Sequence, residues 1–355
     1  SDMIFSELYP EDKYRYPLLK NKYSFSFNQK LDDKPYKTNQ NFEISLDVLT
    51  SEYDTIDLID TNLILKASQT NSVVLCIAQQ KTYLEEITRY LKIEKFLRTP
   101  FKETILKGEQ IELAKKEELE IRRNNAKMFL VDALEKGSIF VNNGKFESKS
   151  KDIKNILNEA MGNLVDKVYY KLNYITNPME EAKIKEVLAS YSSNITKLTD
   201  EAEDANIKAI KEVLDYIISK SRLAKISLKT VVERFKKQPY GFNEVDIQWI
   251  IAKLLRNGEI SFTLNSEVIT LSTASVDDIF RYLTRKEYLE KLLIEIKQKA
   301  TEKQKRNVKD VEDILFGTVY NNNDDELIFK NFKEKQLVSF EYSLKEIKNN
   351  YKNDL

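Results

Sequence analysis

Short apolar stretches near the N-terminus predict a group of β-strands. Tyr23–Phe27 and Phe42–Val48 alternate apolar and polar residues, which is the pattern of a half-buried strand. The runs Leu63–Leu65 and Val73–Ile77 are apolar and rich in branched side chains, and the polar turn Gln69–Ser72 between them predicts a hairpin. We therefore expect a sheet in this part of the chain.

Helices are predicted to follow these strands. Gln79–Phe96 and Ser150–Leu172 place apolar side chains three or four residues apart, as in a helix with one buried face. Ile111–Lys136 is longer and carries many charges of both signs, which is typical of a solvated helix. Between these helices, the sequence Asn142–Lys145 predicts a hairpin turn.

The remainder of the chain is predicted to be mainly helical. Asn177-Pro178 interrupts the pattern, so an α/β domain is expected at residues 1–177. A helical connector is expected at 178–224 and a C-terminal helical region at 273–355, with one long helix or two over 276–305. The predicted fold class is therefore α+β and predominantly helical, with an N-terminal α/β region ahead of a helical one.

Within the helical part, residues 206–272 follow the order of a winged helix. The predicted elements are, in order, a helix at about 206–220, a short strand at 225–226, helices starting at Ser227 and Asn243, and strands at 259–264 and 267–271. Pro239 stops the second helix, and Gly258 suits the left-handed residue that often ends a helix. Trp249 is expected to be a core anchor because isoleucines follow it. We take residues 225–272 as the winged-helix-like unit.

The residue inventory excludes most catalytic chemistry. The chain has no histidine and one cysteine, so histidine-based nucleophile systems, zinc sites with histidine and all-thiolate metal sites are ruled out. Its seven glycines form neither a G-x-G-x-x-G pattern nor a P-loop. Acidic pairs are expected to act as helix caps or solvated surface; these are Asp32-Asp33, Asp277-Asp278 and Asp324-Asp325. No catalytic, cofactor-binding or metal-binding residue is therefore predicted, and the chain is not expected to be an enzyme.

The cysteine count and hydropathy also indicate a location. Cys76 lies in an apolar run and is expected to be a buried strand residue. A single cysteine excludes an intramolecular disulfide and fits a reducing compartment. No apolar stretch reaches the ~20 residues that a membrane span needs. We expect a cytoplasmic chain without membrane contact.

Charge is balanced over the whole chain and concentrated only locally. Lys and Arg total 57, as do Asp and Glu, so no overall field attracts nucleic acid. Glu244 and Asp246 stand where a DNA-reading third helix would meet the bases, so packing on protein is favoured for the winged unit. Residues 297–309 are predicted to form a helix with six basic residues against one acidic, typical of a solvated helix but also of phosphate contact. The candidate nucleic-acid contacts are Lys236, Lys237, Arg256, Lys297, Lys299, Lys303, Lys305, Arg306 and Lys309.

Four segments carry a family resemblance. They are Phe25–Tyr36, Tyr90–Arg98, Phe235–Phe242 (FKKQPYGF) and Ile250–Ile260. Together they resemble BrxC/PglY proteins, the large P-loop ATPases of BREX phage-defence systems. The ATPase module of that family, with its Walker lysine, has no counterpart here. The resemblance therefore implies an ATPase fragment, with ATP and Mg²⁺ expected only in the missing module and other phage-defence proteins as partners.

The predicted function is a non-catalytic segment of a bacterial anti-phage ATPase, which couples the motor to DNA or to partner subunits. The alternative is a protein–protein assembly scaffold that makes no contact with nucleic acid. Salt-dependent binding of a DNA duplex would separate the two. Double-stranded DNA thus stays a candidate partner, and a homo-oligomer is left open.

Overall fold

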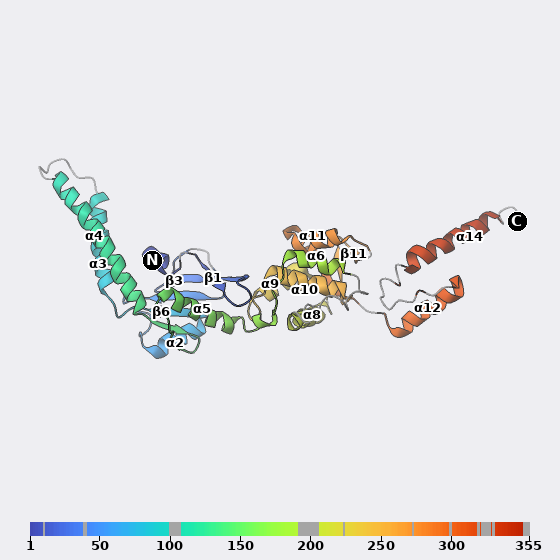
Figure 1. The fold of residues 1–355 in the computed structure, drawn as a ribbon, viewed down its shortest axis with the longest axis horizontal. Coiled ribbons are helices and arrows are strands. Elements are labelled where there is room, and N and C mark those ends of the chain that lie inside the picture. The colour runs from blue at the N-terminus through green and yellow to red at the C-terminus, as the bar shows by residue number, and fades with distance from the viewer. Residues whose placement is uncertain are drawn as a thin grey trace. The chain divides into compact units, whose positions relative to one another are not determined.

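The computed structural model of the chain divides into two compact units, each described here by itself. Unit 1 comprises Ser1–Asn173 with Lys237–Gly241, and unit 2 comprises Tyr174–Lys236 with Phe242–Leu355. The fold is α+β and predominantly helical, as predicted (Figure 1). The residues that the structure describes are 1–9, 11–37, 41–98, 108–190, 206–222, 224–271, 273–297, 300–317, 320, 328 and 331–350.

A six-stranded sheet of order β4-β3-β5-β6-β7-β8 forms the centre of unit 1. Its strands are β3 (Asn28–Leu31), β4 (Lys34–Pro35), β5 (Ser45–Leu49), β6 (Ser72–Cys76), β7 (Ser138–Val141) and β8 (Gly144–Phe146). β3, β5 and β6 run parallel, whereas β4, β7 and β8 pair antiparallel to their neighbours. Every residue of β5 is buried, because a parallel strand in the middle of a sheet is covered on both faces. The predicted hairpin at Asn142–Lys145 is confirmed as the β7–β8 turn.

Helices cover this sheet, and a separate two-stranded ribbon packs beside it. The ribbon pairs β1 (Lys13–Tyr16) with β2 (Tyr23–Ser26) in antiparallel register. Figure 1 shows α3 and α4 side by side, extending from the sheet as a long helical hairpin. The helices of unit 1 are α1 (Asp2–Leu8), α2 (Asp60–Gln69), α3 (Thr82–Arg98), α4 (Gly108–Glu135) and α5 (Ile153–Val168), followed by a 3₁₀ turn at Leu172–Tyr174.

One strand predicted in unit 1 is wrong. Leu63–Leu65 belongs to helix α2, so the expected hairpin with Val73–Ile77 does not exist. Leu63 and Ala67, one helical turn apart, are buried in a cluster with Val74 and Phe140 of the sheet. A three-residue apolar run cannot distinguish strand from helix, and covering this face of the sheet decides in favour of the helix.

The five residues Lys237–Gly241 complete unit 1. The Lys171 amide donates to the Pro239 carbonyl (2.9 Å), and the Gln238 amide donates to the Glu43 carboxylate (2.9 Å). Gly241 has φ +65, in the left-handed region that favours glycine, and a Cβ there would lie 2.7 Å from a ring carbon of Tyr169. The close approach and the backbone conformation therefore both require glycine at this position.

Unit 2 contains the winged helix, whose order of elements is confirmed. Its four-stranded sheet has the order β11-β10-β12-β9. Ser227 caps the second helix, since its Oγ accepts from the Thr230 amide (3.2 Å), and Gly258 is left-handed with φ +67. The elements are α6 (Glu181–Ala189), α8 (Ile207–Ser221), β9 (Ile226–Ser227), α9 (Leu228–Lys236), α10 (Glu244–Arg256), β10 (Ile260–Leu264), β11 (Glu267–Ile269), α11 (Val276–Thr284) and β12 (Leu293–Ile296).

The helix or helices predicted over 276–305 are wrong in their second part. α11 ends at Thr284, and after a 3₁₀ turn at Lys286–Tyr288 the chain forms β12. β12 pairs with β10, opposing Phe262 to Ile294. Residues 293–296 form a strand because of a tertiary contact: without β12, strand β10 would have an unpaired edge beside the apolar core.

Two further helices follow β12. α12 (Glu302–Phe316) begins at Thr301, which forms a capping box with Gln304. α14 (Val338–Asn350) follows a π-helical turn at Phe332–Leu337. Among the helices in the described ranges, none has an apolar span long enough to cross a membrane.

Candidate functional site

Helix α10 holds the position of the recognition helix in a winged helix. In a DNA-reading version this helix lies in the major groove and presents side chains to base edges. Here every residue from Glu244 to Arg256 is buried or half-buried. Helices α6, α8, α9 and α11 of unit 2 pack around it (Figure 1). α10 therefore packs on its own domain over most of its surface, and Glu244, Val245, Lys253 and Arg256 are its half-buried residues.

The acidic residues in the first turn of α10 contact other parts of unit 2. Asp246 is 1% exposed, and its carboxylate accepts a 2.7 Å hydrogen bond from the Met179 amide. Glu244 forms a 3.1 Å ion pair with Lys236. Trp249 is buried, as expected for a core anchor. These contacts give the helix a packing role within unit 2.

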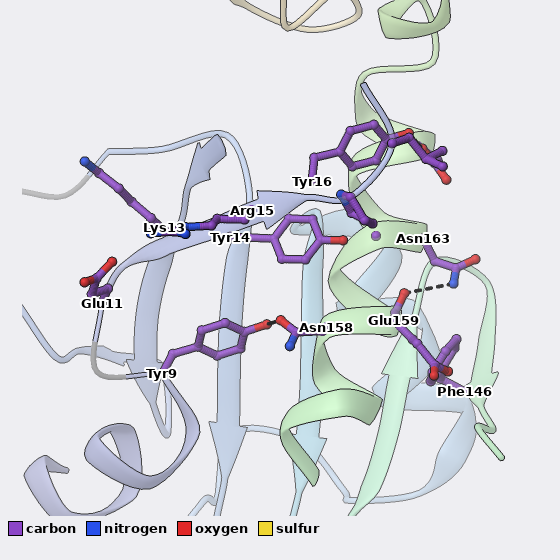
Figure 2. Close-up of a pocket in the computed structure, with 14 residues that line it drawn as sticks. Tyr9, Glu11, Lys13, Tyr14, Arg15, Tyr16, Phe146, Asn158, Glu159 and Asn163 are labelled. Atoms are coloured by element: carbon purple, nitrogen blue, oxygen red, sulfur yellow. Dashed lines mark hydrogen bonds between the residues drawn. The ribbon is translucent and has the colours of Figure 1, made fainter. Parts of the chain in front are cut away.

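A feature of a different kind lies in unit 1, where three tyrosines meet helix α5. The Tyr9 hydroxyl donates to Asn158, and the Tyr16 hydroxyl donates to Asp166. Between these two contacts, the Tyr14 hydroxyl lies over Gly162, where a Cβ would be 2.9 Å away. The contacted helix residues Asn158, Gly162 and Asp166 are four apart, so they lie on one face of α5. Figure 2 shows the Tyr9 and Asn158 side chains pointing toward each other. We call Tyr9, Tyr14 and Tyr16 the tyrosine ladder. Together with the contacted residues of α5, they line a pocket of about 760 Å³.

The hydroxyls of the tyrosine ladder can donate hydrogen bonds, but they do not act as a general base at neutral pH. Burial, followed by the charge of Asp166, raises the pKa of Tyr14 to about 12. Burial and the hydrogen bond to Asp166 raise the pKa of Tyr16 as well. All three phenols therefore stay protonated at neutral pH, and the arrangement suits packing and polar contact better than catalysis. The alternation Lys13-Tyr14-Arg15-Tyr16 was the available sequence signal for this strand, and it was missed.

Gly162→Ala is expected to change sign with the residue at position 14. In the wild type the new Cβ overlaps the Tyr14 hydroxyl, so we expect lower stability. In a Tyr14→Phe background the obstacle is gone, and alanine in the helix should stabilise by about 1 kcal/mol relative to glycine. Urea unfolding of the four proteins of this double-mutant cycle measures the effect. Equal effects of Gly162→Ala in both backgrounds would contradict the packing of Tyr14 on Gly162.

Comparison with known families decides the identity of both units. Residues 1–164 match the sequence model described as the BREX ATP-binding protein BrxC 4th domain with six-stranded beta sheet. Residues 171–298 match the one described as the BREX ATP-binding protein BrxC winged helix-turn-helix domain. The chain belongs to the BrxC family. The first description agrees with the six-stranded sheet of unit 1, and the second match runs through β12. No solved structure matches the chain.

The basic residues predicted to contact nucleic acid in and after the BrxC winged helix domain differ in their surroundings. Lys236 is engaged with Glu244, and Lys237 belongs to the segment counted with unit 1. The Arg256 side chain is half-buried, and its Nε has no hydrogen-bond partner among the described residues. Lys297 follows β12, and its backbone amide donates to the Glu259 carbonyl (3.0 Å). Lys299 lies outside the described residues.

The remaining candidates lie on α12. The prediction of one basic helix over 297–309 is wrong in its start, because β12 ends at Ile296 and the helix begins only at Glu302. Lys303 and Arg306 are exposed. Lys305 lies 3.6 Å from Glu302, and Lys309 is half-buried. Exposed positive charge on this helix is therefore confined mainly to two side chains.

A buried ionic network lies on the α2 side of the BrxC fourth-domain sheet. Asp47 is 1% exposed, and neither of its carboxylate oxygens has a hydrogen-bond partner among the described residues. Lys30, opposite it in the register, approaches to 4.0 Å. Burial raises the pKa of Asp47 despite the opposing charge of Lys30. Nearby, burial alone would raise the pKa of Asp33, but hydrogen bonds from Lys66 and Tyr53 lower it.

Asp47→Asn and Asp33→Asn are expected to have opposite effects on stability at neutral pH. The pKa of Asp47 is raised on folding, so the native state loses stability as pH rises from about 4 toward that higher pKa, and Asp47→Asn should melt above the wild type at pH 7. The pKa of Asp33 is lowered, so its ionised form stabilises the fold at neutral pH, and Asp33→Asn should melt lower. Both differences should shrink toward acid pH. Melting curves at several pH values check this, and effects of one sign would contradict it.

The acidic pairs have structural contacts where they are described. Asp32 accepts from the Thr50 amide (2.7 Å) and hydroxyl (2.8 Å), and Asp277 pairs with Lys185 (2.8 Å). The Asp324-Asp325 pair lies outside the described residues. In the described part of the chain, no group of three or more acidic, cysteine or histidine side chains could hold a metal ion. Cys76 ends β6 and is half-buried, and burial raises the pKa of its thiol.

Proposed function

We propose that this chain is a non-catalytic segment of a BREX phage-defence protein, and that it couples the ATP-binding part of the system to partner subunits or to DNA. The observation that carries the proposal is the coverage of α10. A winged helix whose recognition helix is covered by its own domain serves as a rigid structural body, so other surfaces are left to make outside contacts. A cytoplasmic location agrees with the single cysteine.

The sequence assigns no nucleotide chemistry to these residues. Neither a P-loop nor a histidine occurs in the 355 residues, and the phenols of the tyrosine ladder remain protonated. We place the ATP and Mg²⁺ used by the family outside this segment. Binding of a fluorescent ATP analogue in the presence of Mg²⁺ would overturn that part of the proposal.

The test of the coupling role is recovery of partners. The tagged chain, produced together with the other proteins of its BREX system, is expected to recover at least one of them after nuclease treatment. The nuclease removes bridging DNA, so recovery reports contact between proteins. Recovery of none would contradict coupling to partner subunits. Light scattering of the purified chain then decides whether it self-associates.

A further inference from the structure

The β1–β2 ribbon, with the turn that joins its strands, carries charge of one sign only. Residues 13–26 contain four basic residues and no acidic one. Lys13 and Arg15 are exposed on β1, and Lys20 and Lys22 are exposed in the turn that follows. We call this surface the basic ribbon face. Its nearest acidic neighbours in the sequence, Glu11 and Asp12, precede the strand.

The strand geometry separates the basic from the aromatic side chains. Successive residues of a strand point to opposite faces, so Lys13 and Arg15 lie opposite to Tyr14 and Tyr16. Figure 2 shows both tyrosines turned toward α5, whereas Lys13 extends away from it. Asp166 and Glu159 of α5 stand on the tyrosine side, and Asp166 is engaged with Tyr16. Among the described residues, neither Lys13 nor Arg15 has an ion-pair partner.

The cross-strand register completes a surface of hydrogen-bond donors. Lys13 is opposite Ser26, and Arg15 is opposite Ser24. Arginine, lysine and serine are side chains that proteins use to contact phosphate oxygens. Lys13 and Arg15 are about 6.7 Å apart along the strand, which is far enough for the two side chains to contact different phosphates. The turn at Leu19–Asn21 has left-handed backbone throughout and closes with a 3.1 Å bond from the Lys22 amide to Leu19.

We propose that the basic ribbon face binds the phosphate backbone of duplex DNA. Two observations favour this partner over others. Tyr14, Tyr16, Tyr23 and Phe25 are all buried on the opposite face, so the ribbon offers no stacking platform for single strands. A protein interface has an apolar centre. Between residues 13 and 26 only one large apolar side chain, Leu18, is exposed, which is too little for such a centre. The proposal rests on the proposed function and gives its DNA contact a place distinct from α10.

Fluorescence anisotropy of a labelled duplex tests the proposal with the full chain. If four phosphates are contacted, affinity should fall by about 100-fold between roughly 50 and 200 mM salt. Lys13→Glu with Arg15→Glu should weaken binding by at least ~10-fold at the lower salt, and its remaining salt dependence should be only about 10-fold. The matched control, Arg285→Glu with Lys286→Glu, makes the same charge change at two exposed residues of unit 2 and should leave binding within about threefold of the wild type.

Several results would overturn the proposal. They are the absence of wild-type binding at the lower salt, an unaffected ribbon variant, and equal losses in ribbon variant and control. Lys13→Gln with Arg15→Gln, which removes charge without reversing it, gives the same readout if the glutamate variant fails to fold. Recovery of BREX proteins by the ribbon variant separates the two proposals. Lost DNA binding with intact recovery supports the ribbon, whereas intact DNA binding in this variant overturns the ribbon proposal whatever its recovery. Failure of the wild-type chain to recover any BREX protein contradicts coupling to partner subunits and leaves the ribbon result unaffected.

Discussion

Asp246→Ala is expected to destabilise unit 2 by about 2–3 kcal/mol. The substitution removes a buried carboxylate and leaves the Met179 amide without the 2.7 Å hydrogen bond it now donates. Losing a hydrogen bond to a charged group costs more stability than losing one between neutral groups. The Met179 amide that remains is also kept away from water, so no water replaces the lost acceptor. Trp249 is the single tryptophan of the chain and is buried in α10, so its fluorescence during urea unfolding reports this unit.

The matched control for this prediction is Asp277→Ala. Asp277 also ties the region of α6 to a neighbouring helix, through a 2.8 Å ion pair with Lys185, but its side chain is 82% exposed. Exposed pairs of this kind contribute about 0–1 kcal/mol, so the control should unfold close to the wild type. If both variants lost the same stability, the burial of Asp246 would not explain its importance.

Gly241→Ala is expected to cost about 3 kcal/mol or more. The left-handed backbone, with φ +65, adds about 1–2 kcal/mol for any residue with a Cβ. The new Cβ would also lie 2.7 and 2.9 Å from two ring carbons of Tyr169 and 3.1 Å from Phe25, and such overpacking costs about 1–3 kcal/mol. Hydrogen exchange should therefore quicken in β2 and at the end of α5, next to these rings.

Gly258→Ala provides the comparison within the same chain. Gly258 has φ +67, but a Cβ there would meet no atom within 4 Å. Only the backbone term remains, so the expected loss is about 1–2 kcal/mol. A Gly241→Ala variant no less stable than Gly258→Ala would mean that Tyr169 does not pack on Gly241.

The winged helix could be predicted from sequence because each of its boundaries is marked locally. Ser227, Pro239 and Gly258 cap, stop and end helices by mechanisms that need only neighbouring residues. β12 has no such mark, since Leu293–Ile296 becomes a strand only by pairing with β10. Leu63–Leu65 was misassigned for a related reason, because the sheet it covers is built from other parts of the chain.

The candidate site was less predictable than the fold. Tyr16 and Asp166 are 150 residues apart, and Tyr9 and Asn158 are 149 apart, so no local pattern could join them. The buried state of Asp47 likewise depends on strands on both sides of it. The count of basic residues over 297–309 was correct, but the predicted helix began too early, since the cap at Thr301 starts α12 at Glu302.

The two ends of the six-stranded sheet limit how the BrxC fourth domain can meet other molecules. β4 is two residues long and contains Lys34 and Pro35, and proline has no amide hydrogen to donate. β8, at the opposite end, is three residues long with Lys145 at its centre. Short terminal strands with lysine or proline give a foreign strand few groups to pair with. Copies of this domain can therefore be crowded into one assembly without joining their sheets, and recognition falls to side chains rather than to the backbone.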